Sequence, residues 1–279
     1  MTSRELWIGT YPVAGAGTPV GQGEGVWTVP FDDETGALGA ARQVAVVPSP
    51  SFVAARGPWL YAVSEDEPGA VVALAPGGRH VLVVDLGTDQ VRRYAWDGRT
   101  ATPDGIAVTF PPGTGPRHLD FSPDGRFAYV TGELDRAVHV LAWDVETATG
   151  ALVQSVPAVV DAVSGAAVPD EGARTPPGDD PVRHGDGVLP SHLVLDGDQV
   201  LLTVRGADVL TRWQVGPDGL LVDGSSHALG GHWPRHFAVV GTWLVVALEK
   251  SGELVVLSRD GAERTRLALP SPTCVLPRG

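Results

Sequence analysis

Residues 115–135 read GPRHLDFSPDGRFAYVTGELD, two short apolar segments around the turn sequence SPDG. Apolar segments of this length on either side of an Asp-Gly turn predict a β-hairpin. A hairpin needs neither the Pro-Arg-His before its first strand nor the Gly-Glu-Leu after its second. The stretch therefore poses two questions: how the hairpin is used in the fold, and whether the charged residues at its ends carry chemistry.

The hairpin is one of a series along the chain. Each copy has a strand, a turn that usually contains glycine, a second strand and a polar residue at the end. The other copies are residues 48–66, 71–89, 189–208 and 233–252. A third strand usually follows, at 90–97, 137–145, 209–215 and 253–261, and a less regular fourth strand closes the unit, as at 105–110. Four antiparallel strands repeated at about 40–45 residues predict an all-β fold, the β-propeller.

The spacing of the first strands predicts the number of blades. The anchors Phe52, Val72, Leu119, Leu193, Phe237 and Val275 are separated by 20, 47, 74, 44 and 38 residues. Steps of 47, 44 and 38 are one blade each, and the 74-residue step is one blade with a Gly/Pro/Asp-rich insertion at 161–188. We expect that insertion to be a long rim loop. The 20-residue step is half a blade, so we expect residues 1–279 to form one propeller domain of about five and a half to six blades.

The two ends of the sequence predict how the ring closes. Residues 270–277 resemble a first strand with no second strand after it. Residues 6–11, 26–32 and a segment near 40–47 resemble the strands that it lacks. We therefore expect strands from both ends to form one blade together.

Composition limits the classes of partner. The net charge of −13 argues against nucleic acid and anionic membranes as general partners. Cys274 is the only cysteine, so no intramolecular disulfide or cysteine-based metal cluster can form. No apolar run approaches the roughly 18–20 residues of a membrane span, and no secretory apolar segment follows Met1. We expect a soluble cytoplasmic monomer with no metal and no cofactor.

Equivalent positions of the repeats should form rings around the propeller axis. Arg117 begins a first strand, and Arg235 has the same place in WPRHF. Glu133 ends a second strand, and Arg205 and Glu249 have that position in their own repeats. We therefore expect these five side chains in two adjacent tiers on one face, with Glu249 as a solvated strand-end residue.

These residue types suit the opening of an ester. Attack of water on an ester carbonyl needs a base for the proton and cations for the developing oxyanion. Glu133 is a candidate base if burial raises its pKa against the effect of neighbouring arginines. Arg117 and Arg205 are candidates for the oxyanion or a carboxylate, and Arg235 for a phosphate. The alternative at Arg117 and Glu133 is a structural ion pair between blades.

Histidines follow the arginines in the same repeats. His118 and His192 are candidates for contact with substrate. Because His118, His192 and His236 share one repeat position, the alternative is a role in packing or hydrogen bonding between blades. Trp233 is expected to pack between blades. No acidic cluster has the spacing of a calcium site.

Several motifs together carry a resemblance to a known family. The chain resembles the lactonase family of seven-bladed propellers in five motifs: GPRH and GEL in 115–135, VLVVDLGTDQV (81–91), WPRHFAV (233–239) and PSPTCV (270–275). WIGTY (7–11) extends the likeness. That family includes bacterial 6-phosphogluconolactonase and is related to fungal muconate-lactonising enzymes. The resemblance implies a site near the central channel, in which Arg117, Glu133 and Arg205 match the arginine, glutamate and arginine of the family.

The resemblance also identifies departures. The family histidine has no match, and Ala70 occupies the aligned position. About one and a half blades are missing between Glu67 and Gly78, either because the chain lacks them or because the sequence omits them.

The implied function is hydrolysis of a sugar lactone, with 6-phospho-glucono-1,5-lactone of the pentose phosphate pathway as the first candidate. The alternatives are a lactonase or cycloisomerase for another organic-acid lactone, and a non-catalytic propeller that binds a small ligand or a protein.

Overall fold

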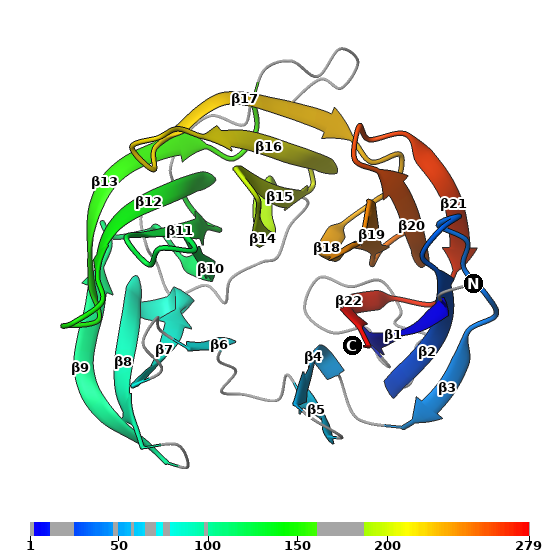
Figure 1. The fold of residues 1–279 in the computed structure, drawn as a ribbon, viewed down its shortest axis with the longest axis horizontal. Coiled ribbons are helices and arrows are strands. Elements are labelled where there is room, and N and C mark those ends of the chain that lie inside the picture. The colour runs from blue at the N-terminus through cyan, green and yellow to red at the C-terminus, as the bar shows by residue number, and fades with distance from the viewer. Residues whose placement is uncertain are drawn as a thin grey trace.

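The computed structural model describes residues 3–11, 25–46, 50–56, 59–64, 71–74, 79–97, 100–160 and 187–278. In these residues the chain forms strands and one short 3₁₀ helix, η1 (Leu86–Thr88). The strands belong to sheets set around a common centre, as a propeller requires (Figure 1). The long rim loop predicted at 161–188 lies almost entirely outside the described residues.

Five of the sheets in the described part have four antiparallel strands each, which confirms the predicted blade. Their strands succeed one another from the centre to the rim in chain order, apart from the closing blade (Figure 1). The innermost strands are β6 (Val71–Leu74), β10 (Pro116–Phe121), β14 (Leu189–Asp196), β18 (Pro234–Val240) and β22 (Pro272–Pro277). The second strands are β7 (His80–Asp85), β11 (Phe127–Gly132), β15 (Gln199–Arg205), β19 (Trp243–Leu248) and β1 (Ser3–Thr10). The third strands are β8 (Gln90–Trp96), β12 (Ala137–Asp144), β16 (Val209–Val215), β20 (Glu253–Ser258) and β2 (Gly25–Asp32). The outer strands are β9 (Ala101–Thr109), β13 (Thr149–Pro157), β17 (Leu221–Ala228), β21 (Glu263–Ala268) and β3 (Arg42–Ala45).

A sixth sheet has only two strands, β4 (Pro50–Arg56) and β5 (Trp59–Ser64). Phe52 lies in β4 and Val72 in β6, and β6 already begins the next four-stranded sheet. The 20-residue step between these anchors is therefore half a blade, as the spacing predicts. Ala70, aligned with the family histidine, lies outside the described residues.

The closing blade combines strands from both ends of the chain, in the order β22-β1-β2-β3, which confirms the predicted closure. Ile8 of β1 is opposite Val275 of β22, and Leu6 is opposite Pro277. Because β22 is the innermost strand of this sheet, the ring depends on pairing between segments far apart in sequence.

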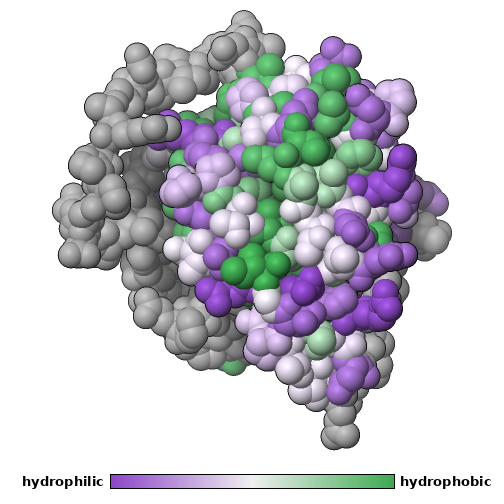
Figure 2. All heavy atoms as spheres, turned by 90° about the vertical axis from the view of Figure 1, so that its left-hand side faces the viewer, coloured by the Kyte–Doolittle hydropathy of each residue, from purple (hydrophilic) through white to green (hydrophobic). Residues whose placement is uncertain are grey.

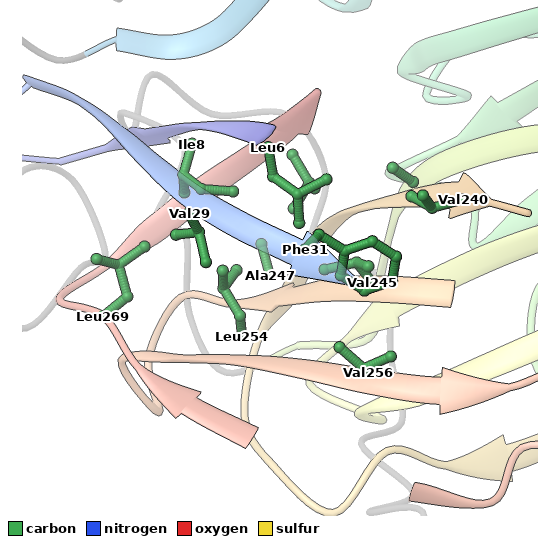
Figure 3. Close-up of a cluster of buried hydrophobic side chains, with 12 residues drawn as sticks. Leu6, Ile8, Val29, Phe31, Val240, Val245, Ala247, Leu254, Val256 and Leu269 are labelled. Atoms are coloured by element: carbon green, nitrogen blue, oxygen red, sulfur yellow. The ribbon is translucent and has the colours of Figure 1, made fainter. Parts of the chain in front are cut away.

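Apolar side chains join the closing blade to its neighbour (Figure 3). Leu6, Ile8, Val29 and Phe31 pack with Val240, Val245, Ala247, Leu254, Val256 and Leu269. Leu6 and Ile8 are fully buried. Burial of a large aliphatic or aromatic side chain contributes about 1.5–3 kcal/mol, so this interface is a major source of stability for the closure.

The entry to an inner strand has a recurring kink, in which a residue with positive φ precedes a proline. Gly115 has φ 57°, Trp233 has φ 65° and Ser271 has φ 45°. Glycine is required at 115, because a Cβ there would lie 2.4 Å from the Leu134 side chain. Trp233 adopts the left-handed conformation with a bulky side chain, at a cost of roughly 1–2 kcal/mol. A register shift follows each kink, and it removes Arg117 and Arg235 from regular strand pairing.

The outer strands carry several exposed apolar side chains, including Ile106 of β9 and Leu152 and Val153 of β13. Figure 2 faces this side of the ring and shows apolar groups interspersed with hydrophilic ones. In the described part of the chain, no helix is long and apolar enough to cross a membrane.

Candidate functional site

Four residues on one face hold equivalent positions directly at the end of a second strand. The second-strand residues opposite the inner prolines are Gly132, Val204, Leu248 and Thr10. The next residues are therefore equivalent: Glu133, Arg205, Glu249 and Tyr11. Backbone bonds fix three of them, since Glu133 N donates to Gly115 O (2.8 Å), Glu249 N to Trp233 O (3.0 Å) and Tyr11 N to Ser271 O (3.2 Å).

The first charged cluster centres on Glu133. Arg117 Nε lies 2.9 Å from Glu133 Oε2, and Arg205 Nη2 lies 2.8 Å from the same oxygen. The side chains of Glu133 and Arg205 are each 4% exposed, and that of Arg117 is 16% exposed. Arg117 Nη1 also donates to Ser191 O in the next blade. The structure thus brings together the three residues that the sequence predicts at the centre of the site.

Electrostatics set the charge of this carboxylate. Burial alone would raise the pKa of Glu133, but the positive charges of Arg205 and Arg117 outweigh burial and lower the pKa below its ordinary value. Burial lowers the pKa of Arg205, and Glu133 opposes that shift. A raised pKa was the expectation for Glu133 as a base; instead, two guanidinium groups at one carboxylate oxygen lower its pKa, so Glu133 is a weaker base than expected.

The second charged cluster repeats the first in another blade. Arg235 Nη1 lies 3.1 Å from Glu249 Oε2, and Arg235 Nη2 donates to the hydroxyl oxygen of Tyr11. The Arg235 guanidinium lies 4.7 Å from the centre of the Tyr11 ring. Glu249 was expected to be solvated, but it is 2% exposed and is paired with Arg235. The expectation of a solvated Glu249 is therefore wrong, and the predicted ring position is correct.

Trp233 lies between the two clusters. Its ring centre is 5.5 Å from Arg205 Cζ and 3.4 Å from Lys250 Nζ. Trp233 is buried, and its backbone N–H donates to Asp208 Oδ1 at 2.8 Å. The indole ring is thus a fixed surface on which two cations lie.

The predicted histidines form a packed group at the inner strands. The His192 and His236 rings are stacked with centroids 3.8 Å apart, and His118 meets His192 edge-on at 4.8 Å. Burial first, and nearby positive charge second, lower the pKa of His118 well below its ordinary value; burial and the neighbouring histidines do the same for His192. Burial, followed by the positive charges of Arg117 and Arg235, lowers the pKa of His236 to about 3. The rings are therefore neutral at physiological pH. Contact of His118 and His192 with substrate stays a prediction.

Two residues of this region, Tyr11 and Lys250, were not predicted from the sequence. Tyr11 has the same strand-end position as Glu133, so an alignment of the closing blade with the other repeats would have identified it. Lys250 directly follows Glu249 and is the only lysine of the 279 residues. The sequence gives a basic residue at this position but does not predict the contact of Lys250 with the Trp233 ring.

The arrangement suits an anionic organic ligand better than a metal ion. Among the described residues, no group of three or more His, Cys, Asp or Glu side chains could hold a metal. Arginines bind carboxylate, phosphate and oxyanion groups through paired N–H donors. The face can therefore bind an anion and stabilise negative charge that develops on a carbonyl oxygen.

A separate cavity of about 310 Å³ lies at the opposite end of the β14–β15 hairpin. Its charged lining residues are Asp196, Asp198, Arg212 and Arg259, and Arg259 is paired with Asp196. Because two acidic and two basic groups balance there, this cavity has no net charge to select an anion. The site is therefore better placed at the two arginine–glutamate clusters.

Comparison with known proteins gives a consistent result. A family model described as "Lactonase, 7-bladed beta-propeller" matches residues 5–75 and 70–277. The 6-phosphogluconolactonase of Bacillus subtilis (strain 168) is 30% identical over 210 residues, which cover 72% of this chain and 54% of the relative. An uncharacterized protein of Lactococcus lactis subsp. lactis is 29% identical over 213 residues, 73% of this chain and 57% of the relative. The chain spans about half the length of the curated relatives it matches.

Solved structures share the fold. The periplasmic gluconolactonase PpgL of Pseudomonas aeruginosa superposes with a TM-score of 0.78 at 21% identity, covering 100% of this chain and 99% of that one. A putative 6-phosphogluconolactonase of Bacteroides fragilis gives a TM-score of 0.74 at 18% identity, covering 99% and 98%. The two parts of the family match meet at residues 70–75, within the interval where the sequence spacing predicts missing strands.

Proposed function

Because this chain belongs to the lactonase family of seven-bladed β-propellers, we propose that it hydrolyses the ester bond of a sugar lactone at Arg117, Glu133 and Arg205. The observation that carries the proposal is the approach of two guanidinium groups to one oxygen of the buried Glu133. The family match supports the reaction class, and the side chains supply cations and a carboxylate in one place.

In the proposed reaction, a water oxygen attacks the lactone carbonyl carbon and the carbonyl oxygen becomes an oxyanion. Arg117 and Arg205 stabilise this charge, as fixed donors do in other acyl transfers. The carbonyl re-forms as the ring C–O bond breaks, and the leaving oxygen takes the proton lost by the attacking water to become the hydroxyl of the open sugar acid. Glu133 is ionised at neutral pH and accepts the proton of water, although its lowered pKa makes it a weak base.

The first candidate substrate within this class is 6-phosphogluconolactone. It is supported by relatives such as the Bacillus subtilis protein, which carry the name 6-phosphogluconolactonase. In this proposal Arg235 lies toward the phosphate, and the enzyme acts as a cytoplasmic monomer. Hydrolysis of an unphosphorylated organic-acid lactone is the alternative within the same class.

A second candidate function is a propeller that binds a sugar acid without catalysis. The observation that favours it is the two-stranded sheet β4–β5, which leaves the ring short of a full set of four-stranded blades in the described residues. The aligned family histidine is also replaced by Ala70.

The test is hydrolysis of 6-phosphogluconolactone measured against its spontaneous rate. We expect the wild type to accelerate the reaction, and Glu133→Gln to lower kcat by about 10²–10⁴-fold, the usual contribution of a positioned base. Glu146→Gln is the matched control, because Glu146 is exposed in a turn. Full activity of Glu133→Gln would exclude the proposed role. Tight binding of 6-phosphogluconate by a wild type with no lactonase activity would support the binder.

A further inference from the structure

The turns between second and third strands repeat one backbone conformation. Four of these turns lie within the described residues, and they end at Asp89, Arg136, Asp208 and Gly252. All four end residues have positive φ, from 54° to 65°. The carbonyl oxygen of each accepts a bond of 2.9–3.0 Å from the N–H that follows the outer strand of its blade. Because aspartate, arginine and glycine all adopt this conformation, the turn itself does not require a carboxylate.

The Asp89 carboxylate binds the entry to the inner strand of the next blade. Asp89 Oδ2 accepts from Gly113 N at 2.8 Å, and Asp89 Oδ1 accepts from Gly115 N at 2.7 Å. The carbonyl oxygen of Gly115 in turn accepts from Glu133 N at 2.8 Å. Arg117 follows Gly115 by two residues. One peptide segment therefore connects the Asp89 carboxylate to the arginine and to the glutamate of the first charged cluster.

Asp208 has the same place in the second charged cluster. Asp208 Oδ1 accepts from Trp233 N at 2.8 Å, and Asp208 Oδ2 lies 2.8 Å from His232 Nδ1. The carbonyl oxygen of Trp233 accepts from Glu249 N at 3.0 Å. Arg235 follows Trp233 by two residues. The connection of carboxylate, kinked entry, arginine and glutamate is thus built twice in one chain.

Among the four described turns, the aspartate occurs where an arginine follows. The inner strands after the two aspartate turns have Arg117 and Arg235 directly after their first proline. The inner strands after the other two turns have Ser191 and Thr273 at that place. The kink at Ser271 forms although the preceding turn ends in glycine. The carboxylate is therefore not needed to make a kink, and its presence goes with the arginine.

We propose that Asp89 and Asp208 are positioning residues, each of which holds the following strand entry so that its arginine meets the carboxylate of its own cluster. For the roles of the clusters this inference rests on the proposed function, in which Arg117 stabilises the oxyanion and Arg235 lies toward the phosphate. Asp89 then serves the chemical step, and Asp208 serves substrate binding. Bonds from a carboxylate to N–H donors are charge-assisted, and a misplacement of about 1 Å can cost about 10²-fold in rate.

The main test reads the position of Arg117 without any use of catalysis. NMR of the full chain, with ¹³C at the glutamate carboxyl carbons, gives the pKa of Glu133, and Glu133→Gln assigns the resonance. Arg117 helps to lower this pKa, so its displacement in Asp89→Gly should raise the pKa. Removal of the Asp89 charge alone would act in the opposite direction. Asp208→Gly should raise the pKa of Glu133 less, because Arg235 contributes less to it than Arg117 does.

The variants are chosen to keep the fold of the turn. Glycine is the natural residue at the equivalent position 252, so Asp89→Gly and Asp208→Gly remove the carboxylates without strain at positive φ. Asp89→Asn also tolerates positive φ and keeps one acceptor oxygen, so it should raise the pKa of Glu133 less than Asp89→Gly. The matched control is Asp223→Gly, at an exposed residue of β17 with φ 49°, which should leave the pKa of Glu133 unchanged.

A second readout separates positioning from a general loss of structure. Asp89→Gly should lower kcat for 6-phosphogluconolactone by about 10–10²-fold with little change in KM. Asp208→Gly should raise KM by about 10-fold with little change in kcat, as expected for a lost binding contact. Asp89→Asn should recover part of kcat, and Asp223→Gly should match the wild type in both constants.

The outcomes separate this inference from the proposed function. A pKa of Glu133 that is unchanged or lower in Asp89→Gly would overturn the positioning role of Asp89, even if the wild type is an active lactonase. A raised pKa would support that role even if the wild type accelerates no lactone, and only the catalytic proposal would then be lost. Equal changes of kcat and KM in Asp89→Gly and Asp208→Gly would overturn the division of roles between the two aspartates.

Discussion

The histidine group predicts a steep loss of stability in mildly acidic solution. His118, His192 and His236 are packed ring against ring, and burial lowers the pKa of each. In the unfolded chain these residues return to their ordinary pKa near 6.5. As the pH falls through that value, the unfolded chain binds protons that the folded chain does not, so the free energy of unfolding decreases. The decrease continues until the pH reaches the folded-state values, about 3 for His236.

The magnitude follows from the number of neutral rings. Between about pH 7.5 and about pH 5.5, one histidine that ionises only when unfolded contributes a loss of about 1.4 kcal/mol. Three such residues give about 4 kcal/mol, a large part of the 5–15 kcal/mol that stabilises a typical domain. Glu133, whose pKa is lowered, would add its own loss only at lower pH, as the pH falls below its ordinary unfolded value.

The assay is urea unfolding followed by tryptophan fluorescence at the two pH values. The wild type should lose about 4 kcal/mol, and His192→Gln about 3 kcal/mol, because one of the three groups is removed. His227→Gln is the matched control, since His227 is exposed on β17 and should leave the difference unchanged. Carboxylates that titrate elsewhere affect wild type and variants alike. The reasoning would be refuted by a wild-type loss below about 1 kcal/mol, or by a loss in His192→Gln equal to that of the wild type.

Two further predictions concern the closure and the buried charge pair. Ile8→Ala should destabilise the protein by about 2–5 kcal/mol in urea unfolding, because Ile8 is fully buried between the closing blade and its neighbour. The control is Ile106→Ala, at a residue that is 49% exposed, which should change the free energy of unfolding by less than about 0.5 kcal/mol. Equal effects of the two substitutions would contradict the packing argument. Arg205→Met should cost roughly 3–5 kcal/mol, because Glu133 loses one of two partners while still buried. The substitution should also raise the pH below which activity falls, because the pKa of Glu133 rises when one positive partner is lost. A variant with wild-type stability and a wild-type pH dependence of activity would show that Arg205 does not hold the carboxylate.

The sequence predicted the architecture because a propeller is a local repeat. Each hairpin carries its own alternation and turn signals, so the strands, the half blade and the closure by both ends could all be inferred from spacing. The same repeat logic placed Arg117 next to Glu133 and Arg235 next to Glu249, because in each blade the start of the inner strand lies beside the end of the second strand.

The sequence could not predict how the side chains share their partners. Whether Glu133 has a raised or a lowered pKa depends on the two guanidinium groups at one of its oxygens, and repeat alignment does not give those distances. Glu249 was assigned to solvent because a charged residue at a strand end is usually exposed, whereas its burial and its pairing with Arg235 depend on the folded structure. Tyr11 belongs to the one blade that the sequence splits between its two ends.

The place of β22 at the centre of the closing blade has a consequence during synthesis of the chain. β1 precedes the other described strands in the chain, yet its partner toward the axis, Pro272–Pro277, leaves the ribosome after every other described strand. Until then β1 presents an unpaired edge, which can pair with another chain. Pairing over such a sequence separation is also slow. We therefore expect the nascent protein to depend on protection of β1, for example by a chaperone, until β22 has emerged and can pair with it.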